Sequence, residues 1–508
     1  MRYDSDTLLM TLAELLRACP PLRENGPIDI LISGLSHDSR QVAPGDLFFA
    51  VPGSKTDGNR HAREALAKGA VAVVSELSPP PPPATLPGTW VQVGSVYEAM
   101  ARCSDAFFGH PSGSMAVVGV TGTNGKTTTT YFLESAVSAC GGTPAVTGTI
   151  DYRLAGARLA KAVNTTPVSL ELTRLLARFR DGGATHALLE ISSHALALAR
   201  VEAVDFDAAV FLNLAGDHLD FHRTADSYFE AKARLFDLLA RADNRKPLKV
   251  AALNADDPRA RSLERRAIGC DIVRFGLTPA ATDLRARILR ADLNGTAFEL
   301  NWRGARWEGA VRLPGAHNIS NALAAAAVLL GLELPAGRVL HGLAALAGVP
   351  GRLESLDEGQ DFHVFVDYAH TASALESVLR LLKTLPHRRL LTVFGCGGDR
   401  DRSKRGPMGL AACGGSELVI LTSDNPRSED PAAILADIAA GIRAAGLQNY
   451  KMVPDREEAI ACAISQAGPG DVVLIAGKGH EDCQILRDRT VPFDDRQAAR
   501  AALRALKR

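Results

Sequence analysis

Short runs of consecutive apolar residues alternate along this chain with amphipathic stretches. In the middle of the sequence these runs read MAVVGV from residue 115, HALLEIS from residue 186, DAAVFLN from residue 207 and KVAALN from residue 249. Runs of this length between polar residues are typical of buried parallel strands, and the intervening stretches suit crossover helices. The pattern therefore predicts an α/β fold with a mostly parallel central sheet.

The same alternation recurs near both ends of the chain. The early runs are DLFFAV, AVAVVS and TWVQV, and the late runs are FHVFVDY, LLTVFG, ELVILTS and DVVLIAG. The turn formers FFGHPSGS and GVPG separate these groups from the middle one. Because 508 residues are too many for one compact core, several domains are expected. We predict three, over residues 1–112, 113–345 and 346–508, with a P-loop-type sheet in the second and an open Rossmann-like sheet in the third.

Charge and cysteine content limit the class of protein. Lys plus Arg and Asp plus Glu both number 57, so no net charge favours nucleic acid or an anionic membrane. The eight cysteines form no CxxC pair, which favours reduced thiols. The start MRYDSDTLLM lacks the basic, apolar pattern of a signal peptide, and no apolar run reaches the roughly 18 residues of a membrane span. We expect a cytoplasmic protein without nucleic-acid or membrane partners.

A glycine-rich loop, TGTNGKTT, follows the strand of residues 115–120 and precedes a helical stretch. Glycines let successive N–H groups point at one anion, and the helix N-terminus adds its positive end. Lys126 would reach the terminal phosphates of ATP, and the Thr127 hydroxyl would bind Mg²⁺. Val120 stands where the usual phosphate loop has its first glycine, which argues against an ordinary kinase or GTPase. The predicted ATP-binding residues of the loop are Thr123, Asn124, Gly125, Lys126, Thr127, Thr128 and Thr129.

Further motifs extend over nearly the whole chain. In order they are HDSR (37–40), NTT (164–166), EISSH (190–194), DHLD (217–220), EAKARLF (230–236), HNISN (317–321), DYAH (367–370), GCGGDRDRSKR (395–405), DNPR (424–427) and GKGHE (477–481). Together with GTNGKTT, this order and spacing resemble the Mur ligase family, which includes folylpolyglutamate synthetases. The resemblance implies domains that bind a UDP-sugar, ATP and an amino acid in turn. It also implies that a carboxylate is activated as an acyl phosphate and then attacked by an amine.

The family pattern implies a magnesium-dependent catalytic centre. By resemblance, Glu190, His218 and a carbamylated Lys232 hold or orient Mg²⁺ with Thr127. The catalytic set is then Lys126, Lys232, Glu190 and His218. Oxygen ligands suit this hard cation, and a desolvated site beside it would favour the neutral amine that carbamylation needs. From the residues alone, His218 could be structural, and EAKARL could be a charged, solvated helix face.

The resemblance also places the nucleotide substrates. Matching positions for UDP-MurNAc-L-Ala-D-Glu are His37, Ser39, Ser54, Lys55, Thr56, Asn164, Thr165, Thr166, Ser192, Leu198 and Arg200. Arg200 is a natural carboxylate partner, whereas Leu198 stands where the family often has Gln. Asn318, Arg352 and Asp367 match contacts to the adenine, phosphate and ribose of ATP.

The DNPR tetrapeptide marks family members that select meso-diaminopimelate over lysine. A planar arginine can grip the second carboxylate of diaminopimelate, and acidic side chains can meet an ammonium group. The implied residues are Arg400, Asp424, Asn425, Pro426, Arg427, Gly477 and Glu481. The expected function is cytoplasmic synthesis of a peptidoglycan precursor by a monomeric ligase whose partners are these small molecules. Alternatives are a lysine-adding Mur ligase, a folylpolyglutamate synthetase-like ligase and a nucleotide-binding switch without ligase activity.

Overall fold

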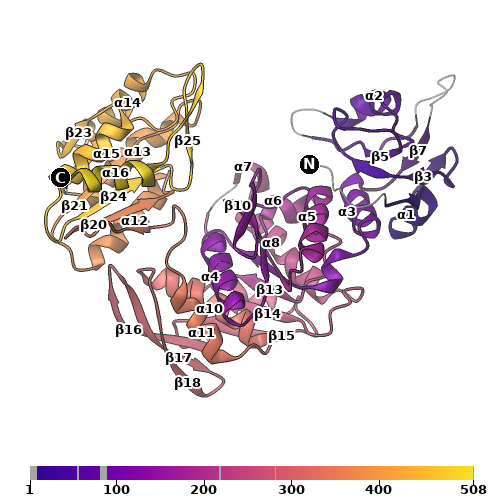
Figure 1. Cartoon of the computed structure of the whole chain (residues 1–508), viewed down its shortest axis with the longest axis horizontal. Helices are drawn as coiled ribbons and strands as arrows, with labels where there is room; N and C mark the ends of the chain where they lie inside the picture. Colours follow the sequence, from indigo (N-terminus) through magenta and orange to yellow (C-terminus); the bar gives the residue numbers. More distant parts are fainter. Residues whose placement is uncertain (1–7, 54–56, 80–87, 217–218, 281, 507–508) are drawn as a thin grey trace. The chain divides into compact units, whose positions relative to one another are not determined.

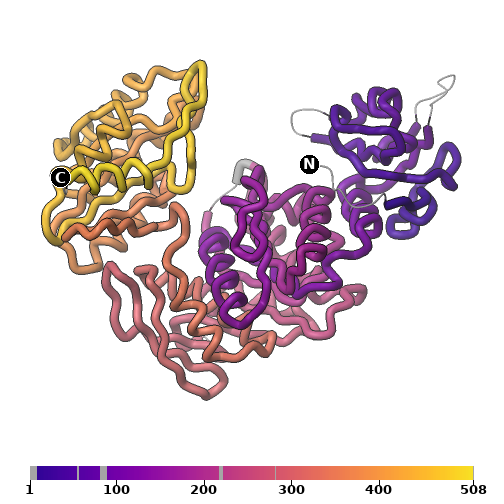
Figure 2. Tube along the Cα trace, viewed as in Figure 1, coloured from indigo at the N-terminus to yellow at the C-terminus, as the bar shows by residue number. Residues whose placement is uncertain are grey.

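The computed structural model describes residues 8–53, 57–79, 88–216, 219–280 and 282–506, and Figures 1 and 2 show the path of the chain. It divides into two compact units. The first comprises Met1–Ala286, Leu300–Trp307 and Ser320–Leu343, and the second comprises Arg287–Glu299, Glu308–Ile319 and Ala344–Arg508. In the described ranges, no helix has the length and apolar character that crossing a bilayer requires.

The first unit opens with a small sheet in the order β2-β7-β6-β5-β4. Its strands are β2 (Arg23–Asn25), β4 (Gly34–Ser36), β5 (Asp46–Phe49), β6 (Ala72–Ser75) and β7 (Thr89–Gln92), and only β2 runs antiparallel to its neighbour. Its helices are α1 (Leu12–Ala18), α2 (Ala62–Ala67) and α3 (Val96–Phe107), and a short pair, β1 (Met10–Thr11) and β3 (Leu31–Ile32), lies apart from the sheet. Side chains of α1 and α3 pack with Phe49 and Val91 in one core, while those of α2 pack with Phe48 and Trp90 in another.

The central sheet follows the order β11-β10-β9-β12-β8-β13-β14-β15-β16-β17-β18. The parallel strands are β9 (Pro144–Thr147), β12 (His186–Glu190), β8 (Ala116–Thr121), β13 (Ala208–Phe211), β14 (Val250–Asn254) and β15 (Asp271–Gly276). The remaining strands are β10 (Asp151–Leu154), β11 (Ala157–Lys161), β16 (Leu284–Asp292), β17 (Gly295–Trp302) and β18 (Ala305–Val311). The predicted parallel strands are present, and the sequence pattern did not predict the antiparallel edge formed by β10 and β11.

Helices follow most of these strands. They are α4 (Lys126–Ala139), α5 (Ser169–Asp181), α6 (Ser193–Ala197), α7 (Leu219–His222), α8 (Ala225–Ala240), α9 (Ala260–Leu263), α10 (Ala316–Gly331) and α11 (Ala336–Ala345). Within the sheet, Val120 of β8 is the register partner of Glu190 on β12. The carboxyl ends of these two strands therefore meet at one edge, where α/β proteins bind ligands.

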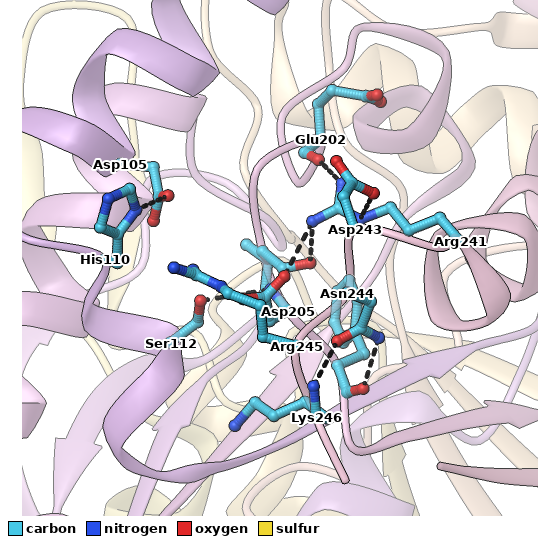
Figure 3. Close-up of polar contacts among 12 residues, drawn as sticks. Asp105, His110, Ser112, Glu202, Asp205, Arg241, Asp243, Asn244, Arg245 and Lys246 are labelled. Atoms are coloured by element: carbon cyan, nitrogen blue, oxygen red, sulfur yellow. Dashed lines mark hydrogen bonds and ion pairs between the residues drawn. The ribbon is translucent and has the colours of Figure 1, made fainter. Parts of the chain in front are cut away.

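A partly buried polar cluster joins the end of α3 to the central sheet (Figure 3). The Asp205 carboxylate, 2% exposed, forms ion pairs with Arg241 at 3.0 Å and Arg245 at 2.8 Å. The backbone N–H of Asp205 donates to the hydroxyl of Ser112, which lies in the short 3-10 helix Pro111–Ser114 after α3. These contacts fix the connection between the first sheet and the central one.

The second unit contains a six-stranded sheet in the order β19-β20-β24-β21-β22-β23. Its strands are β19 (Glu354–Leu356), β20 (His363–Asp367), β24 (Val472–Ala476), β21 (Leu390–Phe394), β22 (Leu418–Leu421) and β23 (Tyr450–Met452), and all except the edge strand β19 run parallel. The other elements are α12 (Ala372–Thr384), α13 (Arg405–Gly415), α14 (Pro431–Ala444), α15 (Arg456–Gln466), α16 (Asp495–Leu506) and the hairpin of β25 (Cys483–Ile485) and β26 (Thr490–Pro492).

Two hydrophobic cores occupy the two faces of this second sheet. Residues of α12, α13 and α14 pack in one core, and residues of α15 and α16 pack in the other. Helices on both faces of a mostly parallel sheet confirm the predicted Rossmann-like class. The boundaries at residues 112 and 345 remain predictions.

Candidate active site

The glycine-rich loop connects β8 directly to α4, as its sequence predicts. Gly125 caps the helix with a φ of 91°, and a Cβ there would lie 2.3 Å from Asn321 Oδ1. Gly122 has a φ of 154°, and a Cβ there would lie 2.8 Å from Leu212 Cβ. The backbone N–H of Asn124 donates to Asn213 Oδ1 at 2.9 Å. Conformation and space therefore both require glycine at positions 122 and 125.

Two lysines converge on the carbonyl oxygen of Gly122. Lys126 Nζ donates to this oxygen at 2.9 Å and to the Thr123 carbonyl at 3.0 Å. Lys232 Nζ, on α8, donates to the same Gly122 oxygen at 2.9 Å and lies 4.5 Å from the centre of the Tyr228 ring. Lys232 is only 1% exposed, so the interpretation of EAKARL as a solvated face is wrong for this residue.

Glu190 lies at the end of β12 beside the phosphate loop and is 1% exposed. Its Oε2 accepts hydrogen bonds from the hydroxyls of Thr127 at 3.0 Å and Thr149 at 2.9 Å, and its Oε1 accepts from the backbone N–H of Thr149 at 3.1 Å. Within the described part of the chain, no lysine or arginine forms an ion pair with Glu190. Burying a carboxylate among neutral donors alone is costly, and a nearby cation offsets that cost.

The Glu190 and Thr127 oxygens suit a hard divalent cation such as Mg²⁺. No group of three or more His, Cys, Asp or Glu side chains that could hold a metal occurs in the described residues. Few protein ligands are usual for Mg²⁺, which keeps water and substrate phosphate oxygens in its coordination sphere. The predicted ligand His218 lies outside the described residues.

The NTT loop packs against the same end of β12. Thr166 Oγ1 donates to the Glu190 carbonyl at 2.8 Å and accepts from the Ser192 N–H at 3.0 Å. Arg200 Nη1 donates to the Thr166 carbonyl at 2.8 Å, and Thr165 Oγ1 lies 3.1 Å from Thr149 Oγ1. The structure thus brings the predicted residues Thr165, Thr166, Ser192 and Arg200 together. Asn164 is exposed beside them, and Leu198, at the end of α6, is partly buried.

The remaining predicted positions of the first unit are less closely linked to this group. His37 and Ser39 follow β4, and Ser39 Oγ donates to Glu64 Oε2 at 3.2 Å. Burial lowers the pKa of His37 and so favours the neutral ring. The predicted residues Ser54, Lys55 and Thr56 lie outside the described residues.

Asp367 and Arg352 lie together in the second unit. The Asp367 oxygens accept backbone hydrogen bonds from Leu353 at 2.7 Å and Ala369 at 2.8 Å. Burial raises the pKa of Asp367, and the nearby Arg352 opposes this rise. Among the described residues, the buried Arg352 Nε has no hydrogen-bond partner. Asn318 Nδ2 donates to the Pro314 carbonyl at 2.9 Å.

The loops after β22 and β24 meet through Asn425. Its Nδ2 donates to Glu481 Oε2 at 2.9 Å, and its Oδ1 accepts from Lys478 Nζ at 3.0 Å. Lys478, which is fully buried, also contacts Glu481 Oε2 at 3.1 Å. A Cβ at Gly477 would lie 2.9 Å from Asp424 Oδ2. The predicted amino-acid site therefore draws its two loops into one hydrogen-bonded unit.

Arg427 has a left-handed backbone with a φ of 53°, which is uncommon for a residue with a side chain. Its Nη1 donates to the carbonyl oxygens of Gly398 at 2.8 Å and Asn425 at 3.4 Å. It forms no ion pair with any described carboxylate. Pro426 is buried next to it, and Arg400 is exposed to solvent. This guanidinium is therefore held by neutral acceptors and can still bind an anion.

Three family models match successive parts of the chain. They are the "Mur ligase family, catalytic domain" over residues 31–107, the "Mur ligase middle domain" over 120–329 and the "Mur ligase, glutamate ligase domain" over 351–479. The chain belongs to the Mur ligase family. The three-domain architecture predicted for this Mur ligase is thereby confirmed.

Known relatives match this Mur ligase over nearly its whole length. It is 47% identical over 497 residues to the UDP-N-acetylmuramoyl-L-alanyl-D-glutamate--2,6-diaminopimelate ligase of Solibacter usitatus, covering 97% of this chain and 98% of that protein. A protein of the same name from Geobacter metallireducens is 43% identical, with 98% and 99% covered. A solved structure of a ligase with this name has a TM-score of 0.72 and 34% identity, with 98% and 100% covered.

The sequence prediction missed three residues that organise these sites in the Mur ligase. Thr149 contacts Glu190, and Lys478 joins the two loops of the amino-acid site. Arg456, 2% exposed, pairs with Asp495 at 2.7 Å and donates to the carbonyls of Ser423 and Ala476, at the ends of β22 and β24. Lys478 lies within the GKGHE motif, and this motif could have identified it from the sequence. Nothing local in the sequence marked Thr149 or Arg456.

Proposed function

We propose that this Mur ligase uses ATP to join meso-2,6-diaminopimelate to the D-Glu carboxylate of UDP-MurNAc-L-Ala-D-Glu, a step of peptidoglycan precursor synthesis. The relatives that match its full length carry the name of this activity. The observation that carries the proposal is the position of Glu190. Its buried carboxylate contacts the phosphate-loop Thr127, and its carbonyl contacts Thr166 of the NTT loop. Glu190 therefore contacts both the phosphate loop and the proposed substrate loop.

The proposed reaction has two steps. An oxygen of the D-Glu carboxylate attacks the γ-phosphorus of ATP, so that a P–O bond forms and ADP leaves. The neutral amine of diaminopimelate then attacks the acyl carbon, and the bond between this carbon and the phosphate oxygen breaks. The leaving inorganic phosphate takes up the proton that the amine loses, and the amide forms. Lys126 exchanges its loop carbonyl partners for phosphate oxygens and stabilises the charge that develops there. Correct alignment of the amine with the acyl phosphate supplies up to about 7–11 kcal/mol.

Mg²⁺ belongs to this proposal as the cofactor. Glu190 and Thr127 would hold it together with His218 and Lys232, and its charge would offset that of the transferring phosphoryl group. We assign carbamylation to Lys232 because its amine is buried next to the phosphate loop. The carbamate would exchange an ammonium group for oxygens that can bind or orient the metal.

Selection of diaminopimelate rests on the loop of residues 424–427. Arg427, with Arg400, would bind a carboxylate that lysine lacks, and Asp424 and Glu481 would meet an ammonium group. With lysine bound, the Arg427 guanidinium would stay without its anion, at a cost of about 1–3 kcal/mol. We further propose that the enzyme works as a monomer in the cytoplasm.

Phosphate release measured with a panel of amino acids tests this function. We expect release only when UDP-MurNAc-L-Ala-D-Glu and an amino acid are both present, with lysine at least about tenfold poorer than diaminopimelate in kcat/KM. Equal rates with lysine would assign the chain to the lysine-adding ligases. Release that continues without either substrate would indicate a nucleotide switch instead.

A further inference from the structure

Thr149 lies two residues beyond β9, between two groups with different proposed tasks. Its hydroxyl is 2.9 Å from Glu190 Oε2 and 3.1 Å from the hydroxyl of Thr165. Its backbone N–H donates to the other Glu190 oxygen at 3.1 Å. A Cβ at the preceding Gly148 would lie 2.3 Å from Glu190 Oε1, so the backbone approaches the carboxylate as closely as glycine permits. Thr149 therefore contacts both the proposed metal ligand and the substrate loop.

The direction of these hydrogen bonds follows from counting protons. An ionised carboxylate can only accept, so the single hydroxyl proton of Thr149 goes to Glu190. Thr149 must then accept the hydroxyl proton of Thr165. Thr127 also donates its only hydroxyl proton to Glu190 Oε2. The hydroxyl proton of each of the three threonines therefore has one defined acceptor.

We infer that Thr149 is a positioning residue. It fixes the orientation of the Glu190 carboxylate and the direction in which the lone pairs of the Thr165 hydroxyl point. Because the proton of Thr165 points at Thr149, its oxygen meets the nucleotide substrate as an acceptor. Thr165 therefore selects an N–H or O–H group of that substrate. Thr127 likewise presents only lone pairs, as a cation ligand should. This inference rests on the proposed function, since it assumes that UDP-MurNAc-L-Ala-D-Glu binds at the NTT loop.

The chain offers a matched control at Thr147, the last residue of β9. Its side chain is fully buried, and its hydroxyl has no hydrogen-bond partner among the described residues. The substitution T147V replaces a hydroxyl by a methyl group, as T149V does two residues further on. Unlike T149V, it breaks no hydrogen bond among the described residues. Any general effect of a valine in this segment appears in both variants.

The test compares T149V, T149S and T147V in two measurements. Calorimetry in EDTA gives the Kd of UDP-MurNAc-L-Ala-D-Glu, which reports on Thr165 without metal or turnover. Phosphate release gives the Mg²⁺ concentration for half-maximal rate, which reports on Glu190. For T149V we expect both values to rise about tenfold, because the Glu190 carboxylate loses one hydrogen bond and the Thr165 hydroxyl loses its acceptor. For T149S, which keeps the hydroxyl, and for T147V, both should stay within about threefold of the wild type.

Different results separate the possible failures. If T149V matches T147V in both measurements, Thr149 has no positioning role. If T149S is as impaired as T149V, the methyl group matters and the proton argument is wrong. A rise in only one of the two values would overturn the claim that Thr149 serves both sites. If the wild-type protein itself does not bind UDP-MurNAc-L-Ala-D-Glu, the proposed function has failed instead.

Discussion

Asp205 and Glu190 are carboxylates buried to a similar degree in the first unit, with 2% and 1% of their surface exposed, but their partners differ in charge. Asp205 forms ion pairs with two arginines (Figure 3), whereas the donors to Glu190 among the described residues are two threonine hydroxyls and one backbone N–H. A buried charge that is neutralised by neighbouring side chains needs nothing from outside the protein. One that has only neutral donors becomes more stable when a cation binds.

The arginines of the second unit show the same contrast. Arg456 is buried and paired with Asp495, which is fully buried as well. Arg427 instead donates to carbonyl oxygens and pairs with no described carboxylate. The paired charges, Asp205 and Arg456, hold elements together. We propose that Glu190 and Arg427, which have no ionic partner in the part of the chain that the structure describes, are the residues that meet ligands.

The substitution E190Q should give the largest effect. It keeps the size of the side chain but removes the charge, so we expect kcat to fall about a thousandfold or more through loss of metal-dependent charge stabilisation. The free energy of unfolding should stay the same or rise, because a buried charge disappears. Phosphate-release kinetics and urea denaturation measure the two quantities. Strong destabilisation would mean that Glu190 is structural, like Asp205.

The reverse pattern is expected for D205N. Arg241, which is 17% exposed and also pairs with Asp243, and Arg245, which is 55% exposed, would both lose the Asp205 carboxylate. This loss should lower the free energy of unfolding by about 1–3 kcal/mol. Per mole of folded enzyme, kcat and the KM values should not change, because the cluster contacts no proposed substrate residue. Urea denaturation and kinetics at a temperature below unfolding test this. A drop in kcat without a change in the free energy of unfolding would mean that Asp205, like Glu190, serves the reaction and not the fold.

The substitution R427K tests the unpaired cation. Lysine keeps the charge but loses the planar two-pronged geometry, and its side chain does not reproduce the donation to Gly398. We expect the KM for diaminopimelate to rise about tenfold, with the KM values for ATP and UDP-MurNAc-L-Ala-D-Glu unchanged. Initial-rate kinetics with each substrate varied in turn measure this. Equal increases for all three substrates would point to a general disturbance of the fold.

The smallest effect concerns Asp105, at the edge of the Asp205 cluster. Burial raises the pKa of Asp105, although its hydrogen bond with His110 opposes the rise. A raised carboxyl pKa means that the folded state binds the proton more tightly, so this group adds stability as the pH falls toward that pKa. D105N should therefore stabilise the protein at pH 7.5 by less than about 1 kcal/mol, and by less still at pH 5. Thermal unfolding at both pH values checks the sign.

Much of the fold could be predicted because its signals are local. β8 and β12 are apolar runs that end in functional residues, and the glycine loop follows β8 without interruption. The strands β16, β17 and β18 were not predicted. The strand β16 carries several charged residues, and most of β18 is exposed, so neither forms a buried apolar run. The strand β17 mostly alternates between buried and partly buried positions, and this pattern was not assigned to a strand.

The motifs of the candidate site were predicted from the sequence, but the contacts between them were not. Lys232 sits in a sequence with charged neighbours, so only its position on α8 against Gly122 shows that it is buried. Thr149 is 41 residues from Glu190 along the chain, and Arg456 is 39 residues from Asp495. Contacts of this kind depend on strand order, which a single sequence does not specify.

The carbonyl oxygen of Gly122, in the phosphate loop, accepts hydrogen bonds from the side-chain amino groups of Lys126 and Lys232. Lys126 therefore already lies beside the loop that we propose binds the triphosphate, and it does not have to be recruited from solvent. An arriving anion would compete for Lys126 with two neutral carbonyl oxygens, those of Gly122 and Thr123. Under the proposed function, nucleotide would bind at this loop through an exchange of hydrogen-bond partners.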